Sequence, residues 1–208
     1  MIPRPVKFLI VFILLASIAC ITVNVPIGGD PTSSAVVWTV DPEIRESWNV
    51  SSNYVIQIKD FSASPALQRV EMIVLAEDGT LNRASTDIWS TRPMELLPDL
   101  LMRDMVYSDA WGAVLRKATM LREDLIVEGF VREFGGRIVE DGWEAVIDID
   151  VTVLDGYSFD LVFQKNYNFH WVLSEPSYRE LAAAMSILVG IWCEEVTGDI
   201  WASMLPIR

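Results

Sequence analysis

The stretch WEAVIDIDVTVL, residues 143–154, decides the fold, because its side chains alternate between apolar and polar along one strand. One side carries Trp143, Ala145, Ile147, Ile149, Val151 and Val153, and the other carries Glu144, Asp148, Asp150 and Thr152. A strand with one apolar and one polar face is typical of an antiparallel sheet that is covered on one side only. The sequence therefore predicts a sheet whose core lies on a single face.

Strands on both sides of this stretch extend the predicted sheet. Asp155-Gly156 turns the chain into a second alternating strand, whose one side carries Tyr157, Phe159, Leu161 and Phe163. Upstream, residues 125–134 form a strand that Gly135-Gly136 breaks or turns. Apolar or alternating runs predict further strands at residues 36–40, 54–59, 70–76, 81–87 and 113–116.

Two segments repeat apolar residues every three or four positions, which predicts two amphipathic helices. The stripe of residues 93–106 is Met94, Leu97, Leu101 and Met105, and that of residues 177–204 is Tyr178, Leu181, Met185, Leu188 and Trp192. Thr91 is the expected N-cap of the first helix, and Pro98 implies either a later start or a kink. The predicted fold class is α+β, a mainly antiparallel sheet with two amphipathic helices packed on one face.

The first twenty residues are organised like an export signal. Arg4 and Lys7 precede an apolar run at residues 8–16, and the segment ends in small residues followed by Cys20. A cysteine directly after such a cleavage site is the mark of a bacterial lipoprotein, in which the thiol is acylated. We predict a signal peptide at residues 1–19 and lipidation of Cys20, with a plain secretory signal and an uncleaved anchor as alternatives.

The rest of the chain divides into a tether and one domain. Residues 20–34 contain the lipidated cysteine and a flexible tether, because two glycines, Pro31 and three hydroxyl-bearing residues fall together there. Residues 35–208 are predicted to be a single periplasmic α+β domain. The net charge of −13 becomes −15 when Arg4 and Lys7 leave with the signal. Such an acidic protein is not expected to bind nucleic acid, whose phosphates require basic partners.

The sequence offers little from which to build a catalytic centre. His170 is the one histidine of the chain, and as a general base it would make the protein an envelope hydrolase. A packed or surface histidine is the preferred interpretation. Asp148 and Asp150 point to one face and suit a cation, but the polar side of an amphipathic strand explains them better. Cys193 is expected to be a buried thiol, and we predict no enzyme activity, no cofactor and no metal site.

Eight tryptophans are a further unusual feature of the sequence. Three of them fit core positions, namely Trp38, Trp143 and Trp192. The others lie at element ends or in loops, at Trp48, Trp89, Trp111, Trp171 and Trp201. Packing, with the indole N–H reaching a partner, is the preferred interpretation, and a contact surface for a protein or a lipid is the alternative.

The order of these segments resembles a known family. A lipoprotein signal is followed by YVIQIKDF (54–61), DIWSTRPMELLPDLLMRDM (87–105), DLIVEGFVREF (124–134), WEAVIDIDVTVLD (143–155) and a long alanine-rich helix. The most telling part is Trp89-Ser90-Thr91-Arg92-Pro93, which leads into a leucine-rich helix. Over most of residues 35–205 the chain resembles the ABC-type transport auxiliary lipoproteins, the group that is similar to paraquat-inducible protein C.

The resemblance implies a non-enzymatic periplasmic component of a Gram-negative envelope system. In that system an ABC transporter and MCE-domain proteins move phospholipid or other hydrophobic cargo between membranes. Cys20 would anchor the protein, the folded domain would dock onto a transport partner, and Ile21 after the cysteine favours the outer membrane. The alternative is a periplasmic lipoprotein that binds a lipid or other hydrophobic ligand in an apolar pocket between sheet and helices. Whether the chain forms a homo-oligomer stays open.

Overall fold

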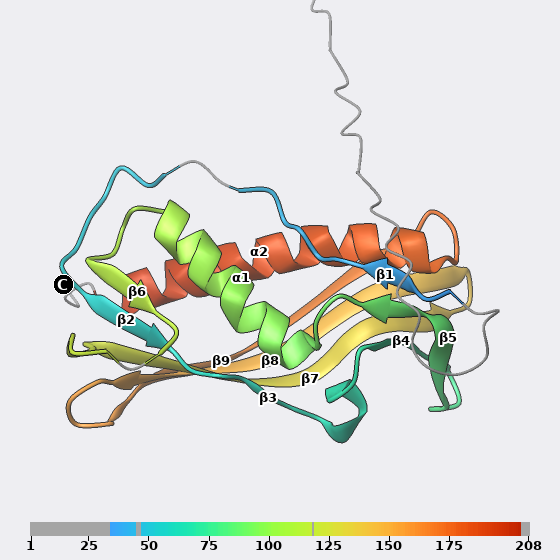
Figure 1. Cartoon of the computed structure of the whole chain (residues 1–208), viewed down its shortest axis with the longest axis horizontal. Coiled ribbons are helices and arrows are strands. Elements are labelled where there is room, and N and C mark those ends of the chain that lie inside the picture. The colour runs from blue at the N-terminus through green and yellow to red at the C-terminus, as the bar shows by residue number, and fades with distance from the viewer. Residues whose placement is uncertain (1–33, 45–46, 118, 205–208) are drawn as a thin grey trace, which may run out of the picture.

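The computed structural model describes residues 34–44, 47–117 and 119–204, which form one sheet and two long helices (Figure 1). The strands are β1 (Val36–Trp38), β2 (Val55–Ile58), β3 (Ser62–Ala63), β4 (Glu71–Leu75), β5 (Leu81–Trp89), β6 (Ala113–Leu115), β7 (Leu125–Val139), β8 (Gly142–Asp155) and β9 (Leu161–Val172). The helices are α1 (Pro93–Tyr107), α2 (Tyr178–Met204) and a short 3-10 turn, η1 (Pro65–Leu67). Both long helices lie on the same face of the sheet, as predicted (Figure 1).

Three long antiparallel strands, β7, β8 and β9, form one side of the sheet, with β9 at its edge. On its other side, β7 pairs in parallel with three short strands, namely β2 near its start, β3 at its middle and β4 near its end. The sheet is widened beyond β2 by β6, and beyond β4 by β5 and then β1. The predicted strand at residues 143–154 therefore pairs with a long strand on each side.

The α+β class is confirmed, but the description "mainly antiparallel" needs correction. Within the described part of the chain, five strand pairings are parallel and three are antiparallel. Two of the antiparallel pairings, β7–β8 and β8–β9, are the long ones, and the alternating patterns of these strands dominate the sequence; the third joins β4 to β5. The parallel pairings join strands that are far apart in the sequence, so no local turn announces them.

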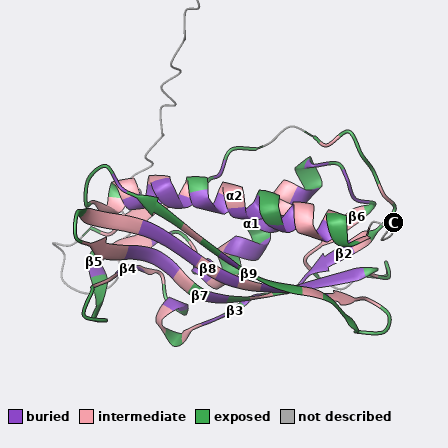
Figure 2. Ribbon diagram, turned by 180° about the vertical axis from the view of Figure 1, so that it is seen from behind, coloured by how far each residue is buried: buried purple, intermediate pink, exposed green. Residues whose placement is uncertain are grey.

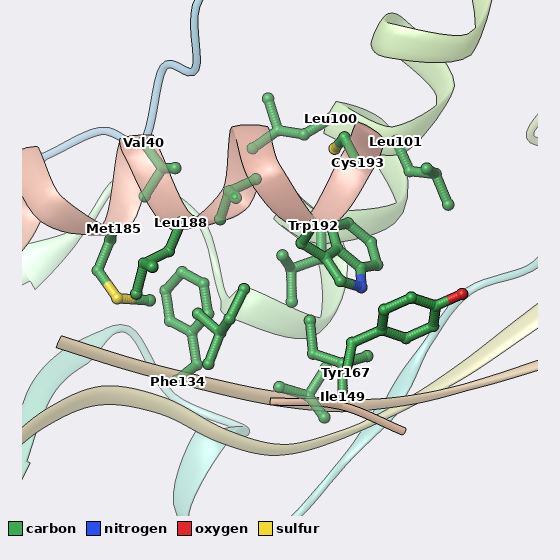
Figure 3. Packing of buried hydrophobic residues seen from close by; sticks show 14 of the residues in the cluster. Val40, Leu100, Leu101, Phe134, Ile149, Tyr167, Met185, Leu188, Trp192 and Cys193 are labelled. Carbon is green, nitrogen blue, oxygen red and sulfur yellow. The ribbon is translucent and has the colours of Figure 1, made fainter. Parts of the chain in front are cut away.

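The core fills the space between α2 and the sheet. Met185, Leu188 and Trp192 of α2 point toward Phe134, Ile149 and Tyr167 of the sheet (Figure 3). Each of these six side chains is at most 1% exposed. By length and composition α2 could cross a membrane, but 56% of its most apolar stretch is buried in this fold. It is the core helix of the domain, as its heptad-like stripe predicts.

The first helix begins where its proline predicts but is capped differently. Its N-cap is Arg92 rather than Thr91, and no side chain caps it. Pro93 occupies the first turn, where a missing N–H is harmless. Pro98 lies inside α1 and is buried, so the alternative of a later helix start is wrong. Packing of its apolar face against α2 offsets the hydrogen bond that Pro98 cannot donate.

Two strand predictions are wrong. Gly135 and Gly136 do not interrupt β7, which continues to Val139 and pairs there with both β4 and β8. The last strand starts at Leu161 rather than at Tyr157, and it extends to Val172. Residues 156–160 form the turn before it, so Tyr157 and Phe159 do not lie on a strand face.

Candidate functional site

The sheet face that the helices leave uncovered carries the predicted acidic pair. Asp148 and Asp150 both accept hydrogen bonds from the Asn166 amide, at 2.6 and 3.0 Å. Asp150 also accepts from Arg132 at 2.7 Å, and these hydrogen bonds hold the pKa of its carboxyl below the usual value, against the opposing effect of burial. The structure therefore brings the pair together, but as members of a cross-strand polar ladder.

The predicted His170 lies on the same uncovered face. Its Nδ1 is 3.2 Å from Glu144 Oε1, and the same oxygen accepts from Arg137 at 3.3 Å. Arg137 also donates to Glu133 at 2.6 Å. These residues form a chain of salt bridges between strands. Among the described residues, the histidine, cysteine and acidic side chains do not gather in threes that could hold a metal ion.

A hollow of about 740 Å³ adjoins this salt-bridge chain. It opens between the β4–β5 hairpin and the β7–β8 hairpin, at the end of the sheet where β1 lies (Figure 1). Its lining includes Leu75, Val139 and Val172, with Glu77, Glu140 and Asp141 at the hairpins. The hollow is open to solvent and lies outside the space between sheet and helices.

The opposite end of the sheet exposes large apolar side chains on two adjacent segments. These residues, called the apolar tip below, are Met120, Leu121, Tyr157, Phe159, Leu161 and Val162. Tyr157 is 76% exposed, Phe159 64% and Leu161 60%. The two segments are held together because Gly156 donates to the Asp124 carbonyl at 2.8 Å and the Arg122 guanidinium lies 4.3 Å from the Tyr157 ring centre. Figure 2 shows this hairpin turn as an exposed end of the molecule.

The turn that carries the apolar tip is held by its own hydrogen bonds. One oxygen of Asp155 accepts from the backbone N–H groups of Tyr157 and Ser158, at 2.9 and 2.8 Å. The Phe159 N–H donates to the Asp155 carbonyl at 3.0 Å. The backbone hydrogen bonds from Ser158 and Tyr157 hold the pKa of the Asp155 carboxyl below its usual value. The exposed rings are thus presented by a defined turn and not by a loose loop.

Phe159 has a backbone conformation that is unusual for its type. Its φ is +61°, in the left-handed region that a bulky L-residue rarely adopts. The conformation costs about 1–2 kcal/mol relative to the ordinary helical or extended regions. The ring gains little from burial in return, because most of it faces solvent. A strained, exposed aromatic residue is a pointer to function.

Most of the tryptophans pack, as the preferred interpretation has it. Trp48 and Trp111 meet Trp201 edge-on, with ring centres 6.3 and 5.6 Å apart. The Trp38 indole donates to Asp87 at 2.8 Å, whereas the buried Trp192 indole N–H finds no partner among the described residues. Trp171 of β9 is 44% exposed. The exposed apolar surface of the described chain is therefore concentrated in other residue types.

Sequence reasoning missed the apolar tip. Because the run from Tyr157 to Leu161 alternates, it predicts a strand with Tyr157, Phe159 and Leu161 on one face. The available signal was the Asp155-Gly156 turn immediately before it, together with the apolar pair Met120-Leu121 in a polar loop. The predicted lipidation site, Cys20, lies outside the described residues, as does all of the tether except Ser34.

Comparison with protein families gives one decisive result. The sequence pattern of a family described as ABC-type transport auxiliary lipoprotein component matches residues 39–197. The chain belongs to this family. The match includes every strand and helix from β2 to β9 and most of α2, so it covers the fold and not a single motif. The family consists of transport components and is not a family of enzymes.

Solved structures show the same fold at low sequence identity. Protein XCC0632 from Xanthomonas campestris has a TM-score of 0.74 and 18% identity, over 81% of this chain and 96% of its own. An uncharacterised protein has a TM-score of 0.62 and 14% identity, over 76% of this chain and 99% of its own. No curated protein matches the sequence. These likenesses establish the fold of this lipoprotein family member and nothing more specific.

Proposed function

We propose that this family member is a lipid-anchored, non-enzymatic accessory component of an envelope transport system. Its partners are an ABC transporter and an MCE-domain protein that move phospholipid or other hydrophobic cargo. The observation that carries the proposal is the family match across residues 39–197. The leader supports it, because Arg4 and Lys7, an apolar run and then Cys20 are the parts of a lipoprotein signal.

The mechanism is tethering. Lipid on Cys20 holds the chain at the periplasmic face of the outer membrane, and residues 21–34 link it to the fold. Fourteen extended residues span at most about 50 Å. The tether keeps the domain within that distance of the bilayer. The effective concentration of a docked partner near the membrane is therefore high. Several acyl chains on one cysteine make such an anchor stable.

The alternative of a lipid-binding domain has less support. It requires a roomy apolar pocket between sheet and helices. That space is occupied by core side chains such as Leu101, Phe134 and Trp192, each fully buried. The hollow that the structure describes lies at the hairpins instead and carries acidic groups at its rim. Docking therefore fits the described domain better than carrying a ligand.

Substitution of Cys20 tests the proposed anchoring. Cys20→Ser in the full chain is expected to abolish acylation and to move the protein from the membrane fraction to the soluble fraction. Mass spectrometry of the purified protein measures the acyl groups. Cys193→Ala is the matched control, because this buried thiol is expected to have no role in anchoring. Wild-type protein that carries no fatty acyl groups would contradict the proposed anchor.

Partnership is tested in the native envelope. Chemical cross-linking followed by purification of the full-length lipoprotein is expected to recover an MCE-domain protein and components of an ABC transporter. The Cys20→Ser variant should recover much less of them, because its local concentration is lost. Recovery of no transport component, from membranes in which the lipoprotein is correctly anchored, would overturn the transport role.

A further inference from the structure

We infer that the apolar tip is the docking element of this domain, and that it fits an apolar pocket with a basic rim on the transport partner. The inference rests on the function proposed above and adds the surface and the chemistry of the contact. It is carried by exposed apolar area on a rigid turn, by local charge, and by the position of the tip relative to the tether.

The tip resembles the centre of a protein interface. Aromatic and aliphatic anchors on a well-defined scaffold supply most of the binding energy in such interfaces. Tyr157, Phe159 and Leu161 each leave at least 60% of their surface in solvent. Met120 and Leu121 of the neighbouring loop widen the patch. Exposed apolar side chains gathered on two adjoining segments in this way mark an interaction site.

The tip is organised before it meets a partner. The hydrogen bonds of Asp155 with the N–H groups of Tyr157 and Ser158 hold the turn closed. Gly156 allows the turn to lie against the 119–124 loop, since a Cβ there would be 2.2 Å from the Glu123 carbonyl oxygen. Binding therefore loses little conformational entropy at the turn, which favours a specific and stable contact.

Charge identifies the partner as a protein and not a bilayer. Residues 119–124 and 155–162 hold one basic side chain, Arg122, against the carboxylates of Glu123, Asp124, Asp155 and Asp160. Anionic lipid headgroups attract basic segments and would repel this one. A protein pocket lined by apolar groups and rimmed by Lys or Arg complements both features of the tip.

The position of the tip agrees with this assignment. The tether joins the fold beside β1, at the end of the sheet opposite the β8–β9 turn (Figure 1). The 14 residues of β8 span about 45 Å between these ends. A domain anchored at one end thus presents the apolar tip to a partner on the far side.

Site-specific photo-cross-linking in the full-length, lipidated protein tests the inference. A photoreactive phenylalanine analogue replaces Tyr157, Val172 or Ile187 in turn. Val172 is 65% exposed at the other end of β9, and Ile187 is 46% exposed on α2. We expect an adduct with an MCE-domain or ABC-transport protein from position 157 only. The purified partner is then titrated with variants, and Phe159→Gly should weaken binding at least about 30-fold, whereas Ile187→Ala should leave it unchanged.

The other outcomes separate this inference from the proposed function. Adducts with a transport protein from position 172 or 187, but not from 157, would contradict the apolar tip as the docking element and would leave the proposed transport role standing. Adducts from 157 with phospholipid or with a second copy of this chain would also overturn the tip as the transport-protein contact. No transport adduct from any position would overturn both. A folded Phe159→Gly variant that binds the purified partner like wild type would remove Phe159 from the contact.

Discussion

Phe159 shows, at the scale of one residue, a conflict between stability and exposure. A left-handed backbone is cheap for glycine and expensive for phenylalanine. Most of its ring lies in solvent, so burial does not offset the strain. Residues of this kind persist where function selects them. The strain at +61° therefore belongs with the proposed docking role and not with the fold.

Phe159→Gly is predicted to stabilise the domain. The change removes about 1–2 kcal/mol of backbone strain. It also gives the unfolded chain extra freedom, which offsets about 0.4–1 kcal/mol of that gain. The free energy of unfolding should rise by about 0.5–1 kcal/mol, measured by urea denaturation of the soluble domain. Phe159→Ala is the control and should show no such rise, because alanine keeps a Cβ in the same conformation.

Single residues also show what the sequence could and could not predict. The burial of Met185 and Trp192 was predicted because core positions impose a period on a helix. Asp148 and Asp150 were correctly placed on the polar side of a strand. Gln57 is a polar residue of the alternating run 54–59, yet it is only 3% exposed. Its burial depends on β6 and β7, which pair with β2 across long loops that no local pattern reveals.

At the scale of elements, β7 illustrates how a glycine pair can be misread. Gly135-Gly136 looks like a turn in isolation, but in the structure it is where β4 pairs in parallel with β7. A Cβ on Gly135 would lie 2.6 Å from the carbonyl oxygen of Ile73. The glycines permit a close approach of two backbones, a role that depends on a strand some sixty residues away.

Two glycine substitutions test this interpretation in opposite directions. Gly135→Ala should lower the free energy of unfolding by about 1–3 kcal/mol, because the β4 backbone must move. Gly198→Ala is the matched change in α2, where a Cβ meets nothing within 4 Å. It should raise stability by about 0.5–1 kcal/mol, since alanine favours a helix. Thermal and urea denaturation measure both, and a harmless Gly135→Ala would refute the close-approach argument.

How well the bounds of an element were predicted depends on whether it has one buried and one exposed face. For β8 and α2, one face is covered and one is wet, so their bounds were predicted to within a residue or two. By contrast, β9 is an edge strand in which Tyr167 is the one buried residue. Its start was misjudged because the apolar alternation already begins at Tyr157, inside the turn that precedes the strand. Tyr167 nevertheless ties β9 to α2, because its hydroxyl donates to Asp199 at 2.8 Å.

At the scale of the whole molecule, the proposed docking joins an acidic domain to a partner with basic groups. The chain carries a net charge of −13. Long-range attraction of this kind acts mainly on the association rate. The domain and its partner should therefore find each other quickly at low ionic strength, while the apolar tip sets how long they remain together.

Salt is predicted to separate these two contributions. Raising the salt concentration from about 0.1 M to 1 M shortens the screening length from about 10 to 3 Å. The association rate with the purified transport partner should fall roughly tenfold or more, and the dissociation rate should change little. Surface plasmon resonance or stopped-flow fluorescence measures both rates. An association rate that does not depend on salt would contradict a basic rim.

The manner in which β1 joins the sheet has a mechanical consequence. In the proposed arrangement, tension between the anchoring bilayer and a bound partner would reach the domain at β1, which is held by three parallel pairs with β5 and by the hydrogen bond from Trp38 to Asp87. These contacts would yield before the core beneath α2. Peeling residues 35–39 away, up to the buried Val40, would lengthen the tether by about 17 Å while the rest of the domain stays folded. An anchored domain of this kind would stay bound to its partner while the distance to the membrane changes.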